Sequence, residues 1–422
     1  MKANFTPEST PSAGSPKRKA GFFESLLIRQ LQKIKTGSLI MRHAGKEHRF
    51  ESSDGKTPVH FEVTNPAFFR KACLGGSLGV ADSYAAGDWQ THDLVGFFRL
   101  FLQNLEVMDG MEGSWAALLN QVARWGYMLG QKNTVKGSRR NIALHYDLGN
   151  DFYELMLDPT MTYSCGIFAT EETTLEEASQ AKYDRIIEQL DIKKGQTVLE
   201  IGCGWGGFAK RLLDTTSATW TGTTISKEQH AYARKVIDQS GHADRANLLM
   251  DDYRTLSGSY DRIVSIEMIE AVGHEYLPTY FSKISNLLRP DGAALIQAIT
   301  MPDHRYEQYL KEVDYIRTRV FPGSCVPSIS AMSSAVAKKS DLRPTGVHDI
   351  GYHYARTLRE WRLRFLENEE SIKSLGYDDA FRRAWIYYLC YCEAGFEEGY
   401  TGDIHLLLTK PGCKTGKGFP NE

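Results

Sequence analysis

The stretch "VLEIGCGWGGFAKRL" (residues 198–212) joins an apolar run, one carboxylate (Glu200) and a cluster of glycines. Gly202, Gly204 and Gly207 have the G-x-G-x-x-G spacing, and Gly206 lies between the last two. Such a loop, placed after a strand and before a helix, brings bare backbone close to a ligand. The spacing alone is a weak signal, so the identity of the ligand has to be inferred from residues on the neighbouring strands.

The next predicted strand argues against a nicotinamide cofactor. An enzyme of that type needs a carboxylate at the end of its second strand to hold the ribose. Here "TWTGTTIS" ends in Thr223, Thr224 and Ser226. S-adenosylmethionine uses the same crevice without a pyrophosphate, and its cationic sulfonium and amino groups match the negative charge of Glu200. Asp252, after the third predicted strand, supplies an acceptor for the adenine amino group.

Local structural roles stay open for some of these side chains. Ser226 and Gln229 also have the spacing of a capping box, and Asp252 also suits the start of a helix. Because the acceptors follow three successive strands, their placement nevertheless favours a cofactor site.

A regular alternation of strand and helix patterns begins near residue 170 and must position these side chains. The predicted strands are 197–202, 219–225, 245–250, 260–267 and 292–299, and the predicted helices are 207–214, 226–240 and 276–288. A helix with a capping box from Thr174 to Glu177 precedes them, and the helical "DDAFRRAWIYYLCYCEAGF" and the strand "DIHLLLTK" follow. This order predicts an α/β fold with a mostly parallel, doubly wound sheet. Residues 301–365 interrupt the alternation at the edge where ligands bind, and we expect them to form a lid.

The N-terminal part has a different organisation. Residues 1–20 are rich in Pro, Ser and Thr and are expected to be a disordered basic tail. The segment 21–35 is either an amphipathic membrane-surface helix or a helix packed on its own domain. Short β-like and glycine-punctuated runs over 37–100 predict a small α+β domain, and 110–140 predict a helical connection. The expected domains are therefore a lipid-associating N-terminal domain (21–125) and a cofactor-binding domain (126–422).

Composition restricts the class of protein. The 422-residue chain is 42% hydrophobic and 24% charged, with a formal net charge of −2, which argues against a nucleic-acid-binding protein. Its first 50 residues hold ten Lys or Arg against three Glu, a balance of +7 that favours an anionic surface such as a membrane. Seven cysteines without a C-x-x-C pair predict a reduced, cytoplasmic protein without a metal site. No run approaches the roughly 20 apolar residues of a membrane span.

Six stretches occur in an order that resembles the cyclopropane-fatty-acid synthase family. They are "HYDLGNDFYELMLDPTMTYSCGIF" (145–168), "VLEIGCGWGGFA", "GTTISKEQ", "DDYR", "MIEAVG" and "FPGSCVPS". Members of this family are S-adenosylmethionine-dependent methyltransferases that act on unsaturated acyl chains of phospholipids, and mycolic-acid methyltransferases share their catalytic domain. The resemblance spans residues 140–410. It implies a Rossmann-like class I methyltransferase fold with a small α+β domain in front.

The resemblance assigns residues to two groups. The implied cofactor site consists of Tyr163, Ser164, Leu199, Glu200, Gly202, Cys203, Gly204, Gly206, Gly207, Thr224, Ile225, Ser226, Gln229, Asp252 and Tyr253. The implied reaction centre consists of Cys165, Glu270, Ile299 and Tyr354 around a bicarbonate ion that serves as base. Cys392 matches a cysteine regarded as a candidate nucleophile in the family. The implied partners are phospholipid acyl chains at the inner face of the membrane and, as a homodimer, a second copy of the chain.

Two positions depart from the family pattern. Gln297 stands where the family's bicarbonate site has a histidine, and Ala271 replaces the histidine of the usual Glu-His-Val-Gly. Glutamine still donates a hydrogen bond to an anion, but it cannot carry positive charge. Methyl transfer is therefore expected, while the final proton acceptor stays open. The product is a cyclopropane chain if the added methyl loses the proton, and a methylene- or methyl-branched chain otherwise.

Methyl transfer to an alkene leaves a carbocation on the acyl chain, so its stabilisers must be negative or π-rich in a dry pocket. Glu270 and Tyr354 have these properties, and Cys392 is not needed as a nucleophile. Each has a structural alternative: a helix-start carboxylate for Glu270, packing for Tyr354, and core cysteines for Cys165 and Cys392. Two rival functions remain, an oxidoreductase on the same glycine loop and a non-catalytic lipid-binding protein.

Overall fold

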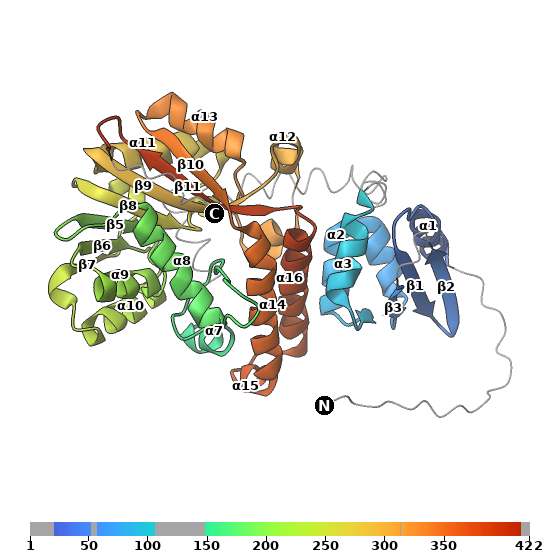
Figure 1. The fold of residues 1–422 in the computed structure, drawn as a ribbon. Helices are drawn as coiled ribbons and strands as arrows, with labels where there is room; N and C mark the ends of the chain where they lie inside the picture. The colour runs from blue at the N-terminus through green and yellow to red at the C-terminus, as the bar shows by residue number, and fades with distance from the viewer. Residues whose placement is uncertain (1–20, 52–56, 106–147, 313, 415–422) are drawn as a thin grey trace.

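The computed structural model describes residues 21–51, 57–105, 148–312 and 314–414. These residues form a four-stranded sheet with helices near the N-terminus and a larger seven-stranded sheet with helices on both faces (Figure 1). The expected tail (1–20), the expected helical connection (110–140) and the expected domain boundary at 125 lie outside the described residues.

The seven-stranded sheet has the order β10-β11-β9-β8-β5-β6-β7. Strands β7, β6, β5, β8 and β9 are parallel, whereas β11 is antiparallel to both of its neighbours. The chain runs from β5 to the β7 edge and then returns to β8 beside β5, so the topological switch point lies between β5 and β8. The bounds are β5 (Thr197–Ile201), β6 (Thr219–Thr223), β7 (Ala246–Leu249), β8 (Tyr260–Ile266), β9 (Leu288–Thr300), β10 (Arg343–Asp349) and β11 (Gly402–Thr409).

Helices cover both faces of this sheet because successive strand residues point to opposite sides. Val198 and Val264 pack with α8, α9 and α10 on one face, and Leu199 and Ile263 pack with α11 and α13 on the other. The expected capping box starts α8. The bounds are α8 (Leu175–Gln189), α9 (Gly207–Thr215), α10 (Lys227–Gln239), α11 (Leu277–Leu287) and α13 (Ile329–Lys339). The predicted α/β architecture with a mostly parallel, doubly wound sheet is confirmed, and the antiparallel strand β11 makes the sheet mixed.

The expectation that all of 301–365 is a lid is wrong for its second half. Helix α13 packs against α11, and β10 extends the sheet as an edge strand beside β11. The sequence "RPTGVHD" of β10 does not predict a strand, because an edge strand with mostly exposed side chains has no apolar run. Residues 301–312 and 314–327, which include α12 (Asp303–Lys311) and a π-helical turn (Ile316–Val320), follow β9 and lie near the carboxyl ends of the parallel strands.

The N-terminal sheet has the order β2-β1-β3-β4 and confirms an α+β arrangement. Helix α1 buries Leu27 and Leu31, and Ile34 just beyond it is buried as well, whereas Phe22 stays 77% exposed. The apolar face of α1 thus packs on its own domain. This confirms the interpretation of segment 21–35 as a helix packed on its own domain rather than on a membrane surface. The bounds are α1 (Phe22–Leu31), β1 (Ser38–His43), β2 (Lys46–Glu51), β3 (Val59–Val63), α2 (Ala67–Ala85), β4 (Trp89–Thr91) and α3 (Leu94–Leu102).

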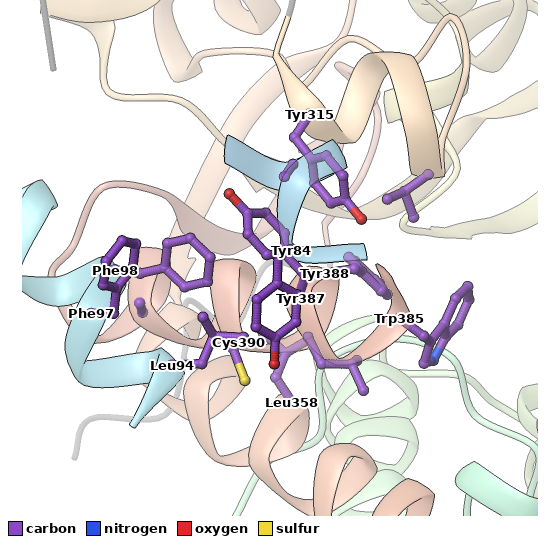
Figure 2. Packing of buried hydrophobic residues seen from close by; sticks show 14 of the residues in the cluster. Tyr84, Leu94, Phe97, Phe98, Tyr315, Leu358, Trp385, Tyr387, Tyr388 and Cys390 are labelled. Atoms are coloured by element: carbon purple, nitrogen blue, oxygen red, sulfur yellow. The ribbon is translucent and has the colours of Figure 1, made fainter. Parts of the chain in front are cut away.

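Helix α16 (Asp379–Glu397) joins the two parts into one hydrophobic core. Its Tyr387 ring contacts Phe98 of α3 edge-on at 4.8 Å and Tyr84 of α2 at 5.6 Å between ring centroids (Figure 2). Its other neighbours are α14 (Gly351–Glu367), α7 (Asn150–Met156) and α15 (Glu369–Ser374). Within the described residues, none of the helices has the length and apolar content needed to cross a membrane.

Candidate active site

A cavity of about 340 Å³ opens at the carboxyl ends of β5, β6 and β8, next to the switch point. Twelve of the fifteen expected cofactor residues line it: Tyr163, Ser164, Glu200, Gly202, Cys203, Gly204, Gly207, Thr224, Ile225, Gln229, Asp252 and Tyr253. The other three lie behind this wall. Leu199 is buried in the sheet core, and Gly206 and Ser226 are the N-cap residues of α9 and α10.

The glycines of the loop serve different purposes. A Cβ on Gly202 would lie 2.8 Å from Met268 Cγ, and a Cβ on Gly207 would lie 2.7 Å from the carbonyl oxygen of Thr160. Gly204 has a φ of +51°, yet a Cβ there would meet none of the described atoms within 4 Å. Packing therefore requires glycine at the first two positions, whereas Gly204 keeps space open in the cavity itself.

Glu200 brings a buried carboxylate to this wall. It is 2% exposed and accepts a hydrogen bond from Trp220 Nε1 at 2.9 Å. Burial raises the pKa of Glu200 to about 8, since desolvation disfavours the charged form. A cationic ligand in the cavity reverses that penalty, and this suits a sulfonium and an ammonium group rather than a phosphate.

Polar groups that follow β6 and β7 complete this part of the cavity wall. Thr224 Oγ1 donates to Gln229 Oε1 at 2.9 Å, while Ser226 caps α10 through the backbone N–H of Gln229. Asp252 caps the 3-10 turn Tyr253–Thr255 and also accepts from the Arg254 guanidinium at 2.7 Å on each oxygen. Capping and cavity lining thus coexist at Asp252, so the two interpretations of this residue do not compete.

Glu267, which the sequence analysis missed, accepts hydrogen bonds from three residues of the expected reaction centre. Its Oε1 accepts from the backbone N–H of Cys165 and from Gln297 Nε2, both at 2.8 Å. Its Oε2 accepts from the hydroxyl of Tyr354 at 2.5 Å. Burial and the charge of Glu267 raise the pKa of Tyr354 well above its usual range, so this hydroxyl stays a proton donor. Three expected centre residues therefore converge on one carboxylate.

Glu270 lies one turn further along the same loop and also lines the cavity. Its Oε1 accepts from the backbone N–H of Ile299 at 2.6 Å, and its Oε2 has no hydrogen-bond partner among the described residues. Burial, followed by the nearby charge of Glu267, raises the pKa of Glu270 to about 8. The backbone N–H of Cys325, in "FPGSC", donates to the Glu270 carbonyl at 2.7 Å and fixes this loop.

Three buried polar residues, Gln297, Asp403 and Lys182, surround the carboxylate of Glu267. Gln297 donates through Nε2 to Asp403 Oδ2 at 2.8 Å as well as to Glu267, and Lys182 donates to Ser164 Oγ. Lys182 is fully buried, and desolvation lowers its pKa. Two sequence signals were available: Lys182 stands in the buried stripe of α8, and Glu267 immediately follows strand β8.

The two expected cysteines differ in their placement. The thiol of Cys165 is fully buried and donates to the carbonyl oxygen of Gly166 at 3.3 Å, so only its backbone N–H reaches the reaction centre. Cys392, on α16, lines the cavity, and burial raises the pKa of its thiol far above the usual range. A thiol held in its protonated form is a weak nucleophile.

Many of the other lining residues are apolar or aromatic. They are Leu102, Ile299, Met301, Ile316, Phe321, Leu358, Tyr388, Tyr391 and Phe396. Tyr354, which also lines the cavity, stacks on Phe396 at 4.3 Å between ring centroids. Leu102 comes from α3, so the N-terminal part contributes to the wall. Within the described part of the chain, no group of His, Cys, Asp and Glu is arranged to hold a metal ion.

The sheet order and the cavity at the carboxyl ends of its strands fit an S-adenosylmethionine-dependent methyltransferase of α/β fold, and the family match shows this class. Residues 133–406 match the family model described as mycolic acid cyclopropane synthetase. The chain therefore belongs to this family of cyclopropane synthases and fatty-acid methyltransferases. The expected enzyme class and family are thereby confirmed, which excludes the oxidoreductase alternative.

Relatives of the chain differ in the products that their names specify. It is 34% identical over 368 residues to tuberculostearic acid methyltransferase UfaA1 of Mycobacterium tuberculosis, which covers 86% of this chain and 85% of the relative. It is also 34% identical over 351 residues to cyclopropane-fatty-acyl-phospholipid synthase of Escherichia coli K12, covering 81% and 86%. Mycolic acid cyclopropane synthase CmaA1, solved with SAH and CTAB, matches with a TM-score of 0.60 and 32% identity, over 64% of this chain and 98% of CmaA1.

Proposed function

We propose that the protein transfers a methyl group from S-adenosylmethionine to the double bond of unsaturated phospholipid acyl chains and forms cyclopropane chains. The observation that carries this proposal is the composition of the cavity wall. The open glycine loop and buried carboxylates line the same cavity as a large set of apolar and aromatic side chains. A cation and a hydrocarbon chain can therefore meet in one water-poor space.

The residues present fit the cofactor. Space over Gly204, the buried carboxyl group of Glu200, which a bound cation would ionise, and the polar groups of Thr224, Gln229 and Asp252 would hold its uncharged and cationic parts. Bound there, S-adenosylmethionine supplies an electrophilic methyl group on sulfur.

The protein's own groups then act on the acyl chain. A cation in the cavity favours the ionised form of Glu270 at the wall, and the Tyr354 and Phe396 rings offer π-faces, so a carbocation is stabilised without being trapped. The aromatic and apolar wall excludes water that would quench the cation.

A second candidate product has a specific observation in its favour. Gln297 stands where the resemblance implies a histidine, which leaves the final proton acceptor open, and the mycobacterial relative is named for tuberculostearic acid. A methylene- or methyl-branched chain is therefore the alternative. A third interpretation, a lipid-binding protein without activity, predicts no product at all.

Gas chromatography with mass spectrometry of lipids from an expressing host separates these outcomes. Cyclopropane and methylene chains share the gain of one CH₂, so dimethyl disulfide derivatisation is needed to detect a remaining double bond. A gain of CH₂ without a double bond or a branched isomer supports the cyclopropane product. A derivatised methylene adduct or a methyl branch replaces it with the alternative, and unchanged lipids reject both.

A homodimer and a place at the cytoplasmic face of the membrane are further proposals that rest on the family resemblance. Light scattering during size-exclusion chromatography tests the first, and co-sedimentation with anionic liposomes tests the second. Since α1 packs its apolar face inside the domain, membrane binding through that face is not part of the proposal.

A further inference from the structure

The carboxylate of Glu267 occupies the hydrogen-bond donors that the family resemblance provides for a bicarbonate ion. The Cys165 backbone N–H, the Gln297 amide and the Tyr354 hydroxyl all donate to it, at 2.8, 2.8 and 2.5 Å. The remaining donor, the backbone N–H of Ile299, is taken by Glu270 Oε1 at 2.6 Å. Bicarbonate does not fit these residues, because its donors are used and the negative charge of Glu267 would repel it.

The backbone of Glu267 is held in an unusual conformation for this purpose. Its φ is +47°, a region that residues other than glycine rarely adopt. The N–H of Glu267 donates to the Gln297 carbonyl oxygen at 2.9 Å, so both the backbone and the side chain of Gln297 fix it. Strain of this kind is maintained by surrounding contacts and is typical of functional positions.

The supporting residues decide which carboxyl group carries the negative charge. Glu267 accepts three hydrogen bonds and faces the positive charge of Lys182, whereas Asp403 accepts one, from Gln297, and its Oδ1 has no partner in the described part of the chain. Burial and the charge of Glu267 raise the pKa of Asp403 well above its usual range. Asp403 therefore holds the proton and Glu267 the charge, and burial raises the pKa of Glu267, which makes it a stronger base.

We infer that Glu267 is the built-in general base of this enzyme and replaces bicarbonate as the acceptor of the proton that the methylated acyl chain loses. This inference rests on the proposed function. In the reaction the C–S bond breaks with its electron pair left on sulfur, and the alkene π pair forms the new C–C bond. The carbocation then loses a proton to Glu267, and the electron pair of that C–H bond closes the ring or forms a double bond. Oε2, with a single donor bound, keeps a lone pair for the proton.

The test measures transfer of labelled methyl from S-adenosylmethionine to dioleoyl phospholipid liposomes in buffer freed of carbon dioxide. Added millimolar bicarbonate should change the wild-type rate less than twofold. Glu267→Gln should lower the rate about a hundredfold or more, the usual range for a general base. Glu267→Gly empties the anion site and suits the φ of +47°, so bicarbonate or formate should restore much of its lost rate. Glu188 is exposed on α8, so Glu188→Gln is the control for effects of making and purifying a Glu→Gln variant.

Calorimetric affinity for S-adenosylmethionine, within a few-fold of wild type in each variant, shows that the variants are folded. Wild-type turnover that rises tenfold or more with bicarbonate overturns the inference, as does near-normal turnover of Glu267→Gln. If Glu267→Gly is slow and neither bicarbonate nor formate restores its rate of methyl transfer, Glu267 has a positioning role. This result overturns its role as base. Wild-type protein that methylates no lipid under any condition overturns the proposed function itself.

Discussion

Replacing Gly204 by alanine separates the two roles that a glycine in this loop can have. With a φ of +51°, the position disfavours any L-residue with a side chain, and this costs about 1–2 kcal/mol. Because the added methyl would meet none of the described atoms within 4 Å, no further loss from crowding is expected in the free protein. For a chain of 422 residues the unfolding entropy is roughly 0.9 kcal/mol/K, so the strain corresponds to a melting temperature lower by roughly 1–2 °C.

The same methyl has a larger effect once a ligand fills the cavity. If the cofactor lies against this backbone, the methyl overpacks the contact, which typically costs about 1–3 kcal/mol. That range corresponds to a dissociation constant for S-adenosylmethionine that is roughly 5- to 150-fold larger. The expected signature is therefore a modest loss of stability together with a large loss of affinity.

Gly241→Ala is the matched control, since Gly241 has a φ of +76°, is exposed, and likewise has open space around its Cβ among the described atoms. It should show the same shift in melting temperature and unchanged affinity. Differential scanning fluorimetry and isothermal titration calorimetry measure the two quantities. A Gly204→Ala variant that binds S-adenosylmethionine as tightly as Gly241→Ala would refute the approach of the cofactor to this loop.

Three further changes have expected outcomes. Since the pKa of Glu200 is raised to about 8, the free protein must release its proton to bind a cation, so affinity should strengthen as pH rises towards 8, by up to about tenfold per unit. Calorimetry of Glu200→Gln should show a shallower pH profile, and identical profiles would contradict this. Glu270→Gln should keep its affinity for S-adenosylmethionine but lose about a hundredfold or more in turnover, measured with labelled methyl; near-normal turnover would show that this charge is not needed. Phe98→Ala removes the ring that contacts Tyr387 and should lower the free energy of unfolding by about 3–5 kcal/mol in denaturant titration, whereas exposed Phe22→Ala should change it by less than about 0.5 kcal/mol.

The glycine loop and the strands around it could be read from the sequence. Apolar runs, capping residues and the loop spacing are local signals, and they located β5 to β9, α9, α10, α11, α16 and β11 to within a few residues. The exception within β9 is its start, which lies at Leu288 rather than 292. Strand β10 was missed because an edge strand packs on one side only and lacks a continuous apolar pattern.

Local sequence signals predicted only some of the residues in the reaction centre. Glu270 was found through "MIEAVG", but Glu267 was missed although it stands three residues earlier and follows β8 directly. Its role depends on donors from Cys165, Gln297 and Tyr354, which are far apart in the chain. No spacing rule relates such positions, because the sheet and α14 bring them together.

What the sequence by itself determined is the type of ligand and the type of scaffold: a glycine loop with Glu200, no ribose carboxylate, and strands alternating with helices. Only the tertiary structure decided which groups meet. It showed that α16 joins both parts of the chain and that the thiol of Cys165 points away while its N–H reaches Glu267. The physical reason is that backbone patterns depend on neighbours in sequence, whereas the charge and hydrogen bonding of a buried carboxylate depend on neighbours in space.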